Sequence, residues 1–254
     1  MEQERYATQV LNYGGGEQTV AMCVLIVNGI IPRPDRIVMA DTSREVKSTW
    51  SYLLEDVQPY LDRHGLKVEI APHSLATVDI YAHNGDMLMP VFTATGKLRA
   101  FCSGEWKVEV VKRYLRSTGV TSATQWIGYA FDETRRWKGK NTEDGPWRIK
   151  FPLVDIGIVK ADCPVIIRKA GLRPARKSRC KMCPNQSNAE WRELRDSSPE
   201  EFEDACKIDE EIREEDDLHA MFLHQDRVPL RDADLDRLDR KEPDRQCTLG
   251  ACFI

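Results

Sequence analysis

Three consecutive glycines near the N-terminus are the feature of this sequence with the clearest chemical use. They open the segment Gly14, Gly15, Gly16, Glu17, Gln18 and Thr19. Successive backbone N–H groups in a tight turn and at a helix start form a nest for phosphate oxygens. Glycine lets the backbone take positive φ or come into contact with the phosphate, and Thr19 adds a hydroxyl donor. A tight strand-to-helix turn without a ligand explains the glycines equally well.

The two best-known phosphate motifs do not occur in this segment. Gly-x-x-x-x-Gly-Lys-Ser/Thr and Gly-x-Gly-x-x-Gly are both missing from the sequence, so neither a Walker NTPase nor a Rossmann dinucleotide site is predicted.

The chain has eight cysteines, two of which form the Cys-x-x-Cys motif Cys180-Lys181-Met182-Cys183. Two sulfurs at this spacing can face one metal ion or each other. Further ligands are available from Cys102, Cys247 and Cys252. A structural zinc, an iron–sulfur cluster, a redox dithiol and free thiols all remain open, because spacing does not separate them. The other three cysteines lie in apolar or helical stretches and are predicted to be buried core thiols: Cys23, Cys163 and Cys206.

Charge is distributed unevenly along the chain. The formal net charge is only −4, so the whole molecule offers no strong attraction for nucleic acid. Arg168–Lys181 nevertheless contains seven basic residues and no acidic one, which predicts a local patch for an anionic partner. Residues 190–217 are acidic with apolar positions at helical spacing, which is typical of a solvated helical face.

Hydropathy argues against a membrane location. The mean hydropathy is −0.49, and no apolar run approaches the roughly 20 residues that cross a bilayer. The charged N-terminus lacks the apolar segment of a signal peptide. We therefore expect a cytoplasmic protein, in which cysteines are thiols or metal ligands before they are disulfides.

The elements that must position these residues follow an alternating pattern in the first half of the chain. Residues 8–13, 36–40 and 66–70 have the composition of buried strands, and residues 20–30 and 47–64 that of helices. Two successive βαβ units predict an α/β fold with a doubly wound, mainly parallel sheet.

The second half is less regular. Residues 105–117 predict a helix and residues 124–131 a strand, whereas residues 71–100 have weak periodicity with a short helix expected at 75–82. Beyond residue 171 the chain is predicted to be mostly helical.

The glycine segment and the later block Met39-Ala40-Asp41-Thr42-Ser43-Arg44-Glu45 resemble the PP-loop adenine nucleotide alpha-hydrolase superfamily. The resemblance is to its phosphoadenosine phosphosulfate (PAPS) reductase-like, or CysH-like, branch, found in phages, mobile elements and some CRISPR loci. Residues 125–136 are similar to a Gly-x-x-x-Asp-Glu-x-x-Arg block of such proteins, and residues 151–153 and 177–184 continue the match. Family members read Ser-Gly-Gly-x-Asp-Ser at the loop, where this chain has Gly14–Thr19.

This resemblance implies a site for ATP or a related adenine nucleotide with Mg²⁺. Its phosphates would lie on Gly14–Thr19, with Asp41 and Thr42 beside the ribose or adenine. Further site residues implied by the matching blocks are Gly128, Asp132 and Glu133. Lys107 and Arg136 are the candidates for offsetting charge during catalysis. The resemblance also favours an iron–sulfur cluster over zinc at the cysteines.

Three functions follow from this resemblance. The first is an enzyme for ATP alpha-hydrolysis, adenylation or sulfur transfer, acting on a nucleic acid or another anionic substrate held at Arg168–Lys181. The second is a PAPS or APS reductase that uses Cys247 or Cys252. The third is a non-catalytic nucleotide-binding accessory protein of a mobile-element or CRISPR-associated complex.

We expect residues 1–170 to form the nucleotide-binding domain and residues 171–254 a mostly helical extension that contains the Cys-x-x-Cys motif.

Overall fold

The computed structural model of this protein describes residue 6, residues 8–214 and residues 220–237. The chain forms two compact units, which are described separately below. The first unit contains the described residues up to Thr77 together with Ser103–Ser178. The second contains Val78–Cys102 and the described residues from Arg179 onward. Among these residues, no helix is both long enough and apolar enough to cross a membrane.

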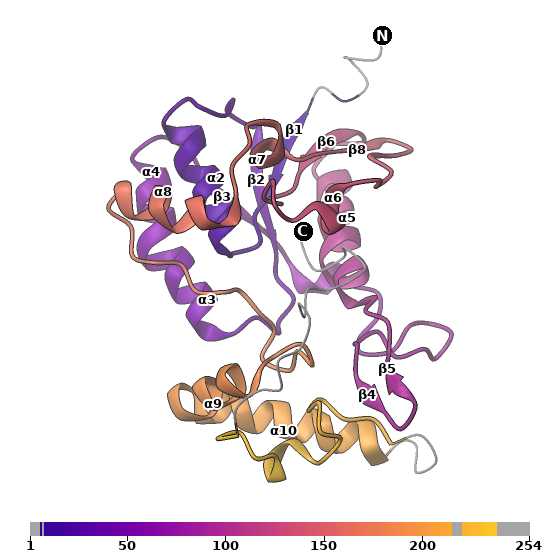
Figure 1. The fold of residues 1–254 in the computed structure, drawn as a ribbon. Helices are drawn as coiled ribbons and strands as arrows, with labels where there is room; N and C mark the ends of the chain where they lie inside the picture. The colour runs from indigo at the N-terminus through magenta and orange to yellow at the C-terminus, as the bar shows by residue number, and fades with distance from the viewer. Residues whose placement is uncertain (1–5, 7, 215–219, 238–254) are drawn as a thin grey trace. The chain divides into compact units, whose positions relative to one another are not determined.

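A six-stranded sheet is the centre of the first unit, with the strand order β3-β2-β1-β6-β8-β7 (Figure 1). Its strands are β1 (Gln9–Asn12), β2 (Arg36–Ala40), β3 (Val68–Ala71), β6 (Ala123–Trp126), β7 (Glu143–Asp144) and β8 (Trp147–Lys150). All neighbouring strands pair in parallel except β7, which runs antiparallel to β8.

Helices cover both faces of this sheet (Figure 1). On one side lie α2 (Glu17–Val27), α3 (Lys47–Tyr52), α4 (Gln58–Asp62) and α8 (Cys163–Lys169), and on the other α5 (Glu109–Ser117) and α6 (Thr134–Trp137). The short helix α7 (Pro152–Asp155) and the 3-10 turns η2 (His73–Leu75) and η4 (Lys160–Asp162) complete the unit. The α/β fold class predicted from the sequence is confirmed.

The strands alternate their side chains between two hydrophobic cores. Leu11, Ile37 and Met39 pack with α2 and its neighbours, whereas Val10 and Val38 pack with α5. Successive residues of a strand point to opposite faces, so fully apolar strands such as β2 are expected when helices cover both sides.

Two of the predicted helices contain a wider turn. Helices α3 and α4 are joined without interruption by the π-helical segment η1 (Leu53–Val57), and α5 is preceded by the π-helical segment η3 (Gly104–Val108). The predictions of helices at residues 47–64 and 105–117 are confirmed, and the π-helical turns had no signal in the hydrophobic spacing.

The second unit brings together two distant parts of the chain. Its elements are β4 (Phe92–Thr93), β5 (Gly96–Lys97), α9 (Asn188–Ser197), α10 (Pro199–Glu214) and the 3-10 turn η5 (Leu230–Asp232). Strands β4 and β5 form a hairpin, and Phe92 and Phe222 exchange backbone hydrogen bonds of 2.9 Å in both directions. Helix α9 begins with a capping box, in which Ser187 and Glu190 each satisfy a backbone N–H of the other.

The structure differs from the sequence-based prediction in four places. Of the helix expected at 75–82, only Leu75 is helical, as the last residue of the 3-10 turn η2. Residues 171–187 contain no helix. Strand β8 was not predicted from the sequence. The second unit also includes residues 78–102, which the sequence assigned to the nucleotide-binding domain.

Candidate functional site

The glycine loop connects the end of β1 to the start of α2. Gly16 is the N-cap of α2, with φ −92° and ψ 170°, and no side chain caps this helix end. The first N–H groups of an α-helix have no carbonyl partner within the helix. Gly15 has φ +73°, and a Cβ atom placed on it would lie 2.6 Å from Thr49 Cγ2. The loop therefore requires glycine at residue 15 and leaves unpaired donors at the start of α2.

This loop lies where the direction of the sheet connections reverses. From β1 the chain moves outward through β2 and β3, then returns to β6 on the other side of β1. In open α/β sheets, ligands bind at such a switch point beyond the carboxyl ends of the strands. The glycine loop follows the carboxyl end of β1, and Gly128 follows that of β6.

Gly128 makes close contact with the loop. A Cβ atom placed there would lie 2.9 Å from Thr19 Cγ2 and 3.3 Å from Gln18 Cβ. Thr19 itself is turned toward the loop, since its hydroxyl donates to the Gly16 carbonyl at 3.0 Å. The structure thus places Gly128 against Gln18 and Thr19 of the glycine loop, although the three residues come from distant parts of the sequence.

The buried side chain of Glu133 connects α2 to the segment that follows β6. Its carboxylate accepts from Gln18 Nε2 at 3.3 Å, from the Ala130 N–H at 3.0 Å and from Arg136 Nη1 at 2.6 Å. The side chains of Glu133 and Arg136 are only 4% and 6% exposed. Because so many of its interactions are internal, Glu133 serves as an anchor between α2 and the segment after β6. The nucleotide contact predicted for Glu133 remains a prediction.

A buried tyrosine lies between an aromatic ring and two cations in the same segment. Tyr129 stacks on Phe151 with ring centroids 5.4 Å apart, and Arg136 Cζ lies 4.3 Å from its ring centroid. Lys140 Nζ lies 5.7 Å from that centroid. Burial lowers the pKa of Lys140, and the positive charge of Arg136 is the second cause.

The segment from Asp41 to Arg44, which also carries predicted site residues, follows β2 and forms a tight turn. The Ser43 N–H donates to Asp41 Oδ1 at 2.7 Å, and Ser43 has φ +56°. Thr42 is fully buried, and its hydroxyl accepts from the Arg44 N–H at 3.2 Å. Arg44 Cζ lies 4.3 Å from the Trp106 ring centroid. Asp41 and Thr42 thus lie at the carboxyl end of β2, the strand next to β1.

The two candidate catalytic cations are both engaged with buried carboxylates. Lys107 Nζ lies 2.6 Å from Glu45 Oε1, with the Glu45 side chain 1% exposed. Arg136 is held by Glu133 as described above. Asp132, in contrast, is exposed, and its Oδ1 accepts from the Lys160 N–H at 2.9 Å. These pairings reduce the capacity of Lys107 and Arg136 to offset charge on a ligand.

Sequence reasoning missed two features of this site. Asn12 Nδ2 donates to Gln125 Oε1 at 3.1 Å, and both side chains are buried at the ends of β1 and β6. The available signal was an amide side chain within each of two strands predicted to be buried. The second feature is Ser178, whose hydroxyl lies 2.5 Å from the Gly14 carbonyl oxygen. No local pattern indicates that contact, since 164 residues separate the two partners.

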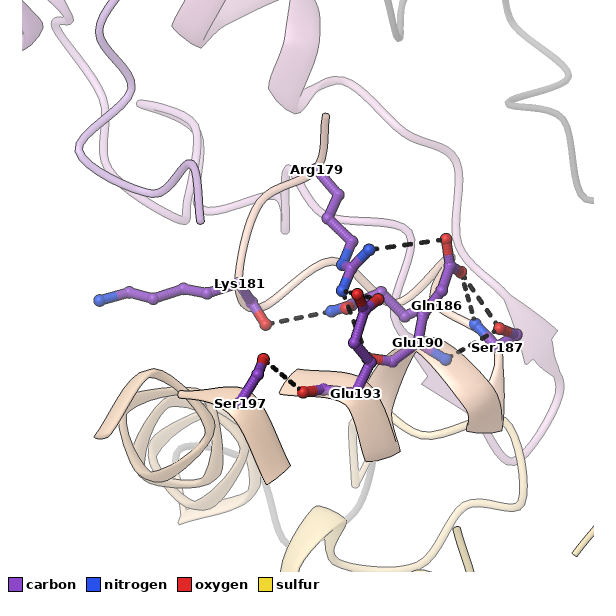
Figure 2. A network of polar contacts seen from close by, with 7 residues as sticks. All are labelled: Arg179, Lys181, Gln186, Ser187, Glu190, Glu193 and Ser197. Carbon is purple, nitrogen blue, oxygen red and sulfur yellow. Dashed lines mark hydrogen bonds and ion pairs between the residues drawn. The ribbon is translucent and has the colours of Figure 1, made fainter. Parts of the chain in front are cut away.

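The Cys-x-x-Cys segment belongs to the second unit and is held by a polar network (Figure 2). Arg179 Nη2 lies 3.0 Å from Glu193 Oε2, and the Lys181 carbonyl accepts from Gln186 Nε2 at 3.1 Å. The Cys183 N–H donates to the Cys180 carbonyl at 3.1 Å. The motif is therefore a turn fixed against α9.

The predicted metal ligands remain a prediction. Cys102, Cys180 and Cys183 are half-buried and belong to the second unit, whereas Cys247 and Cys252 lie outside the described residues. Within residues 8–214 and 220–237, no three His, Cys, Asp or Glu side chains form a metal-binding group. A complete cluster or zinc site would therefore draw further ligands from beyond them. The prediction of buried core thiols is confirmed for Cys23, Cys163 and Cys206.

Comparison with known proteins finds a likeness only among solved structures. No protein-family model matches the chain, and no curated protein matches it. Among solved structures, the chain is similar to the U34-tRNA thiolase NcsA from Methanococcus maripaludis, solved with its [4Fe-4S] cluster. The two are 10% identical, the match covers 80% of this chain and 70% of that one, and the TM-score is 0.47. A likeness at this level does not bear on the chemistry of the site.

Proposed function

We propose that the first unit binds ATP or a closely related adenine nucleotide in the manner of a PP-loop protein. The supporting observation is the position of Gly14–Thr19 at the switch point of the sheet, where the start of α2 has no side-chain cap. Unpaired N–H groups at a helix start attract a phosphate anion by hydrogen bonding and by the helix dipole. The nucleotide phosphates lie on this loop, and Asp41 and Thr42 border the ribose or adenine.

The reaction that suits this arrangement is attack of a substrate oxygen on the α-phosphate, with pyrophosphate leaving. Mg²⁺ enters with the nucleotide as part of the substrate, and the half-buried carboxylate of Asp41 has the oxygen ligands that this ion prefers. Adenylation of this kind activates an acceptor for later sulfur transfer. We propose a nucleic acid or another anionic acceptor, to match the basic residues between Arg168 and Lys181.

A binding function without turnover is the second candidate. It is favoured by the ion pairs of Lys107 with Glu45 and of Arg136 with Glu133, which occupy the cations expected to assist catalysis. Under this alternative the nucleotide would be a structural or signalling ligand of a larger assembly.

Thermal unfolding with different nucleotides tests the proposal. A ligand that binds only the folded state raises the unfolding midpoint according to its concentration relative to its Kd. We expect ATP with Mg²⁺ to raise the midpoint more than PAPS, APS or AMP at equal concentration. No shift with any of the four would contradict nucleotide binding. A larger shift with PAPS or APS would instead support a sulfonucleotide substrate.

Product analysis then separates the two candidates. If ATP binds, release of pyrophosphate or AMP with candidate acceptors supports an enzyme. Binding without either product, over a range of nucleic-acid acceptors, supports the non-catalytic alternative.

We also propose a metal centre at the cysteines, with Cys180 and Cys183 as its core ligands. Thiolates bind both zinc and iron–sulfur clusters. Anaerobically purified protein that is brown and contains iron and acid-labile sulfide supports a cluster. Colourless protein with stoichiometric zinc would replace the cluster by zinc, and protein with neither metal would leave only free thiols.

A further inference from the structure

Phe131 has an exposed aromatic ring in the turn that follows β6. The residue is 47% exposed. A single exposed apolar residue is common on a protein surface, so its backbone and its neighbours decide whether the ring has a use. The Phe131 N–H donates to the Ile158 carbonyl at 2.8 Å, and Asp132 accepts from the Lys160 N–H at 2.9 Å. These two hydrogen bonds fix the backbone that carries the ring.

A second aromatic side chain supports the ring of Phe131. The ring centroid of Trp137, at the end of α6, lies 6.2 Å from that of Phe131, and the two ring planes are inclined at 34°. Aromatic pairs interact favourably at centroid distances of about 4.5–7 Å. Trp137 is itself half-buried. The half-buried ring therefore holds the exposed one in place.

The charges around this aromatic pair favour an anionic partner. Of the charged residues in the segment 131–140, four are basic and two are acidic: Arg135, Arg136, Lys138, Lys140, Asp132 and Glu133. Both carboxylates already accept hydrogen bonds within the protein, Glu133 from Arg136 and Asp132 from a backbone N–H. Arg135 and Lys138, which flank Trp137 in the sequence, are exposed. The exposed ring thus lies in a segment with a net positive charge.

The same segment lies close to the glycine loop. Gly128, three residues before Phe131, lies against Gln18 and Thr19 of the loop. Glu133, two residues after Phe131, accepts from Gln18 Nε2 at 3.3 Å. Three residues of chain span at most about 11 Å. A molecule bound on the Phe131 ring is therefore close to a nucleotide bound at the loop.

We propose that Phe131, Trp137, Arg135 and Lys138 form a binding surface for a single-stranded nucleic acid. A base of the strand stacks on Phe131, and the two cations contact its phosphates. Proteins bind unpaired strands by combining such aromatic stacking with positive charge. A duplex keeps its bases stacked on one another and offers none to the ring. The inference rests on the proposed function and deepens it, because it places the nucleic-acid acceptor next to the glycine loop.

Fluorescence anisotropy of a labelled short oligouridylate tests the role of Phe131. We expect Phe131→Ala to lower the affinity for this strand at least about fivefold, the effect of losing one stacked base. Phe101→Ala is the matched control, because Phe101 is 48% exposed beside Arg99 but belongs to the second unit. Equal losses in the two variants, or no loss in Phe131→Ala, would overturn the proposal. Wild-type protein that fails to bind the strand, or that binds a duplex equally well, would also overturn it.

The double variant Arg135→Gln, Lys138→Gln tests the two cations. Each phosphate contact to a single strand adds about 0.7 to the slope of log affinity against log salt concentration. We therefore expect the slope to fall by about 1.4 in the double variant. Lys67→Gln, just before the amino end of β3, replaces an exposed lysine elsewhere in the first unit and should leave the slope unchanged. An unchanged slope in the double variant would show that the phosphates bind elsewhere.

Calorimetric titration with ATP separates this surface from the nucleotide site. We expect Phe131→Ala to bind ATP within about twofold of the wild-type affinity, a difference of less than about 0.5 kcal/mol. A parallel loss of ATP affinity would mean that the ring stacks on the base of the nucleotide itself, which would overturn the acceptor role. Wild-type protein that binds the strand but no nucleotide would overturn the proposed function and leave the strand contact intact.

Discussion

Gly15 and Gly16 differ in how much room they leave for a side chain, although they are neighbours in one run of glycines. Gly15 has positive φ and no room for a side chain beside Thr49. Any substitution there strains the backbone, so loss of binding in such a variant would not locate the ligand. Gly16 has φ −92°, and in the described part of the chain the one atom found within 4 Å of its Cβ position is Gln18 Oε1 at 3.9 Å. A charged side chain can therefore be introduced at Gly16 without the backbone strain that any substitution causes at Gly15.

Gly16→Asp and Gly16→Asn form a matched pair for that test. Both residues are favoured at an N-cap, so each should preserve or improve the stability of α2. Only aspartate places a negative charge beside the bound phosphates. We expect ATP affinity to be at least about tenfold lower for aspartate than for asparagine, a difference of about 1.4 kcal/mol. Calorimetric titration gives the affinities and thermal unfolding the stabilities; equal affinities would place the phosphates elsewhere.

Among the elements, α10 organises the segment that follows it through one buried carboxylate. Asp209 is 1% exposed and accepts from the N–H groups of Leu223 and Leu230, each at 2.8 Å, and from Arg213. The segment after α10 has little regular structure, so its backbone N–H groups have few partners in a helix or sheet. The Asp209 carboxylate accepts hydrogen bonds from two of these buried N–H groups.

Asp209→Asn should therefore destabilise the second unit strongly. The amide nitrogen cannot accept a hydrogen bond, so a buried donor is left unsatisfied and the Arg213 pair is lost, at a cost of about 3 kcal/mol. Denaturant unfolding measures this loss, and amide exchange should show faster exchange at Leu223 and Leu230. The control is Asp204→Asn on the same helix, whose side chain is 46% exposed. An exposed ion pair is worth less than about 1 kcal/mol; similar effects of the two changes would contradict the role given to Asp209.

The sequence predicts elements well where local composition decides them. Strand β2 was predicted to the residue, because its apolar run is complete within the segment. Residues 78–102 had no such signal, since their partners include Phe222. The same reason explains the site: the glycine loop was evident from its residues, whereas the contact of Ser178 with Gly14 depends on the fold of the whole first unit.

At the scale of the molecule, the second unit is discontinuous in sequence. Val78–Cys102 leaves the α/β unit between β3 and α5 and pairs with the chain after Arg179. This arrangement places Cys102 in the same unit as Cys180 and Cys183, although 78 residues separate Cys102 from Cys180. The six described cysteines thus form two sets, of which one is half-buried in the second unit and the other lies in hydrophobic cores.

Thiol alkylation should separate these two sets in the intact protein. Burial raises the pKa of Cys23 and of Cys163 to about 12 and that of Cys206 to about 11. The thiolate is the reactive form, so at pH 8 these three thiols should remain almost unmodified by iodoacetamide. Because their thiolates form only near pH 11–12, raising the pH to 9 should change this little. Peptide mass spectrometry should find Cys102, Cys180 and Cys183 modified first in metal-free protein and protected after metal loading. Full denaturation should abolish the difference, and rapid labelling of Cys23 in the folded protein would contradict the core in which it lies.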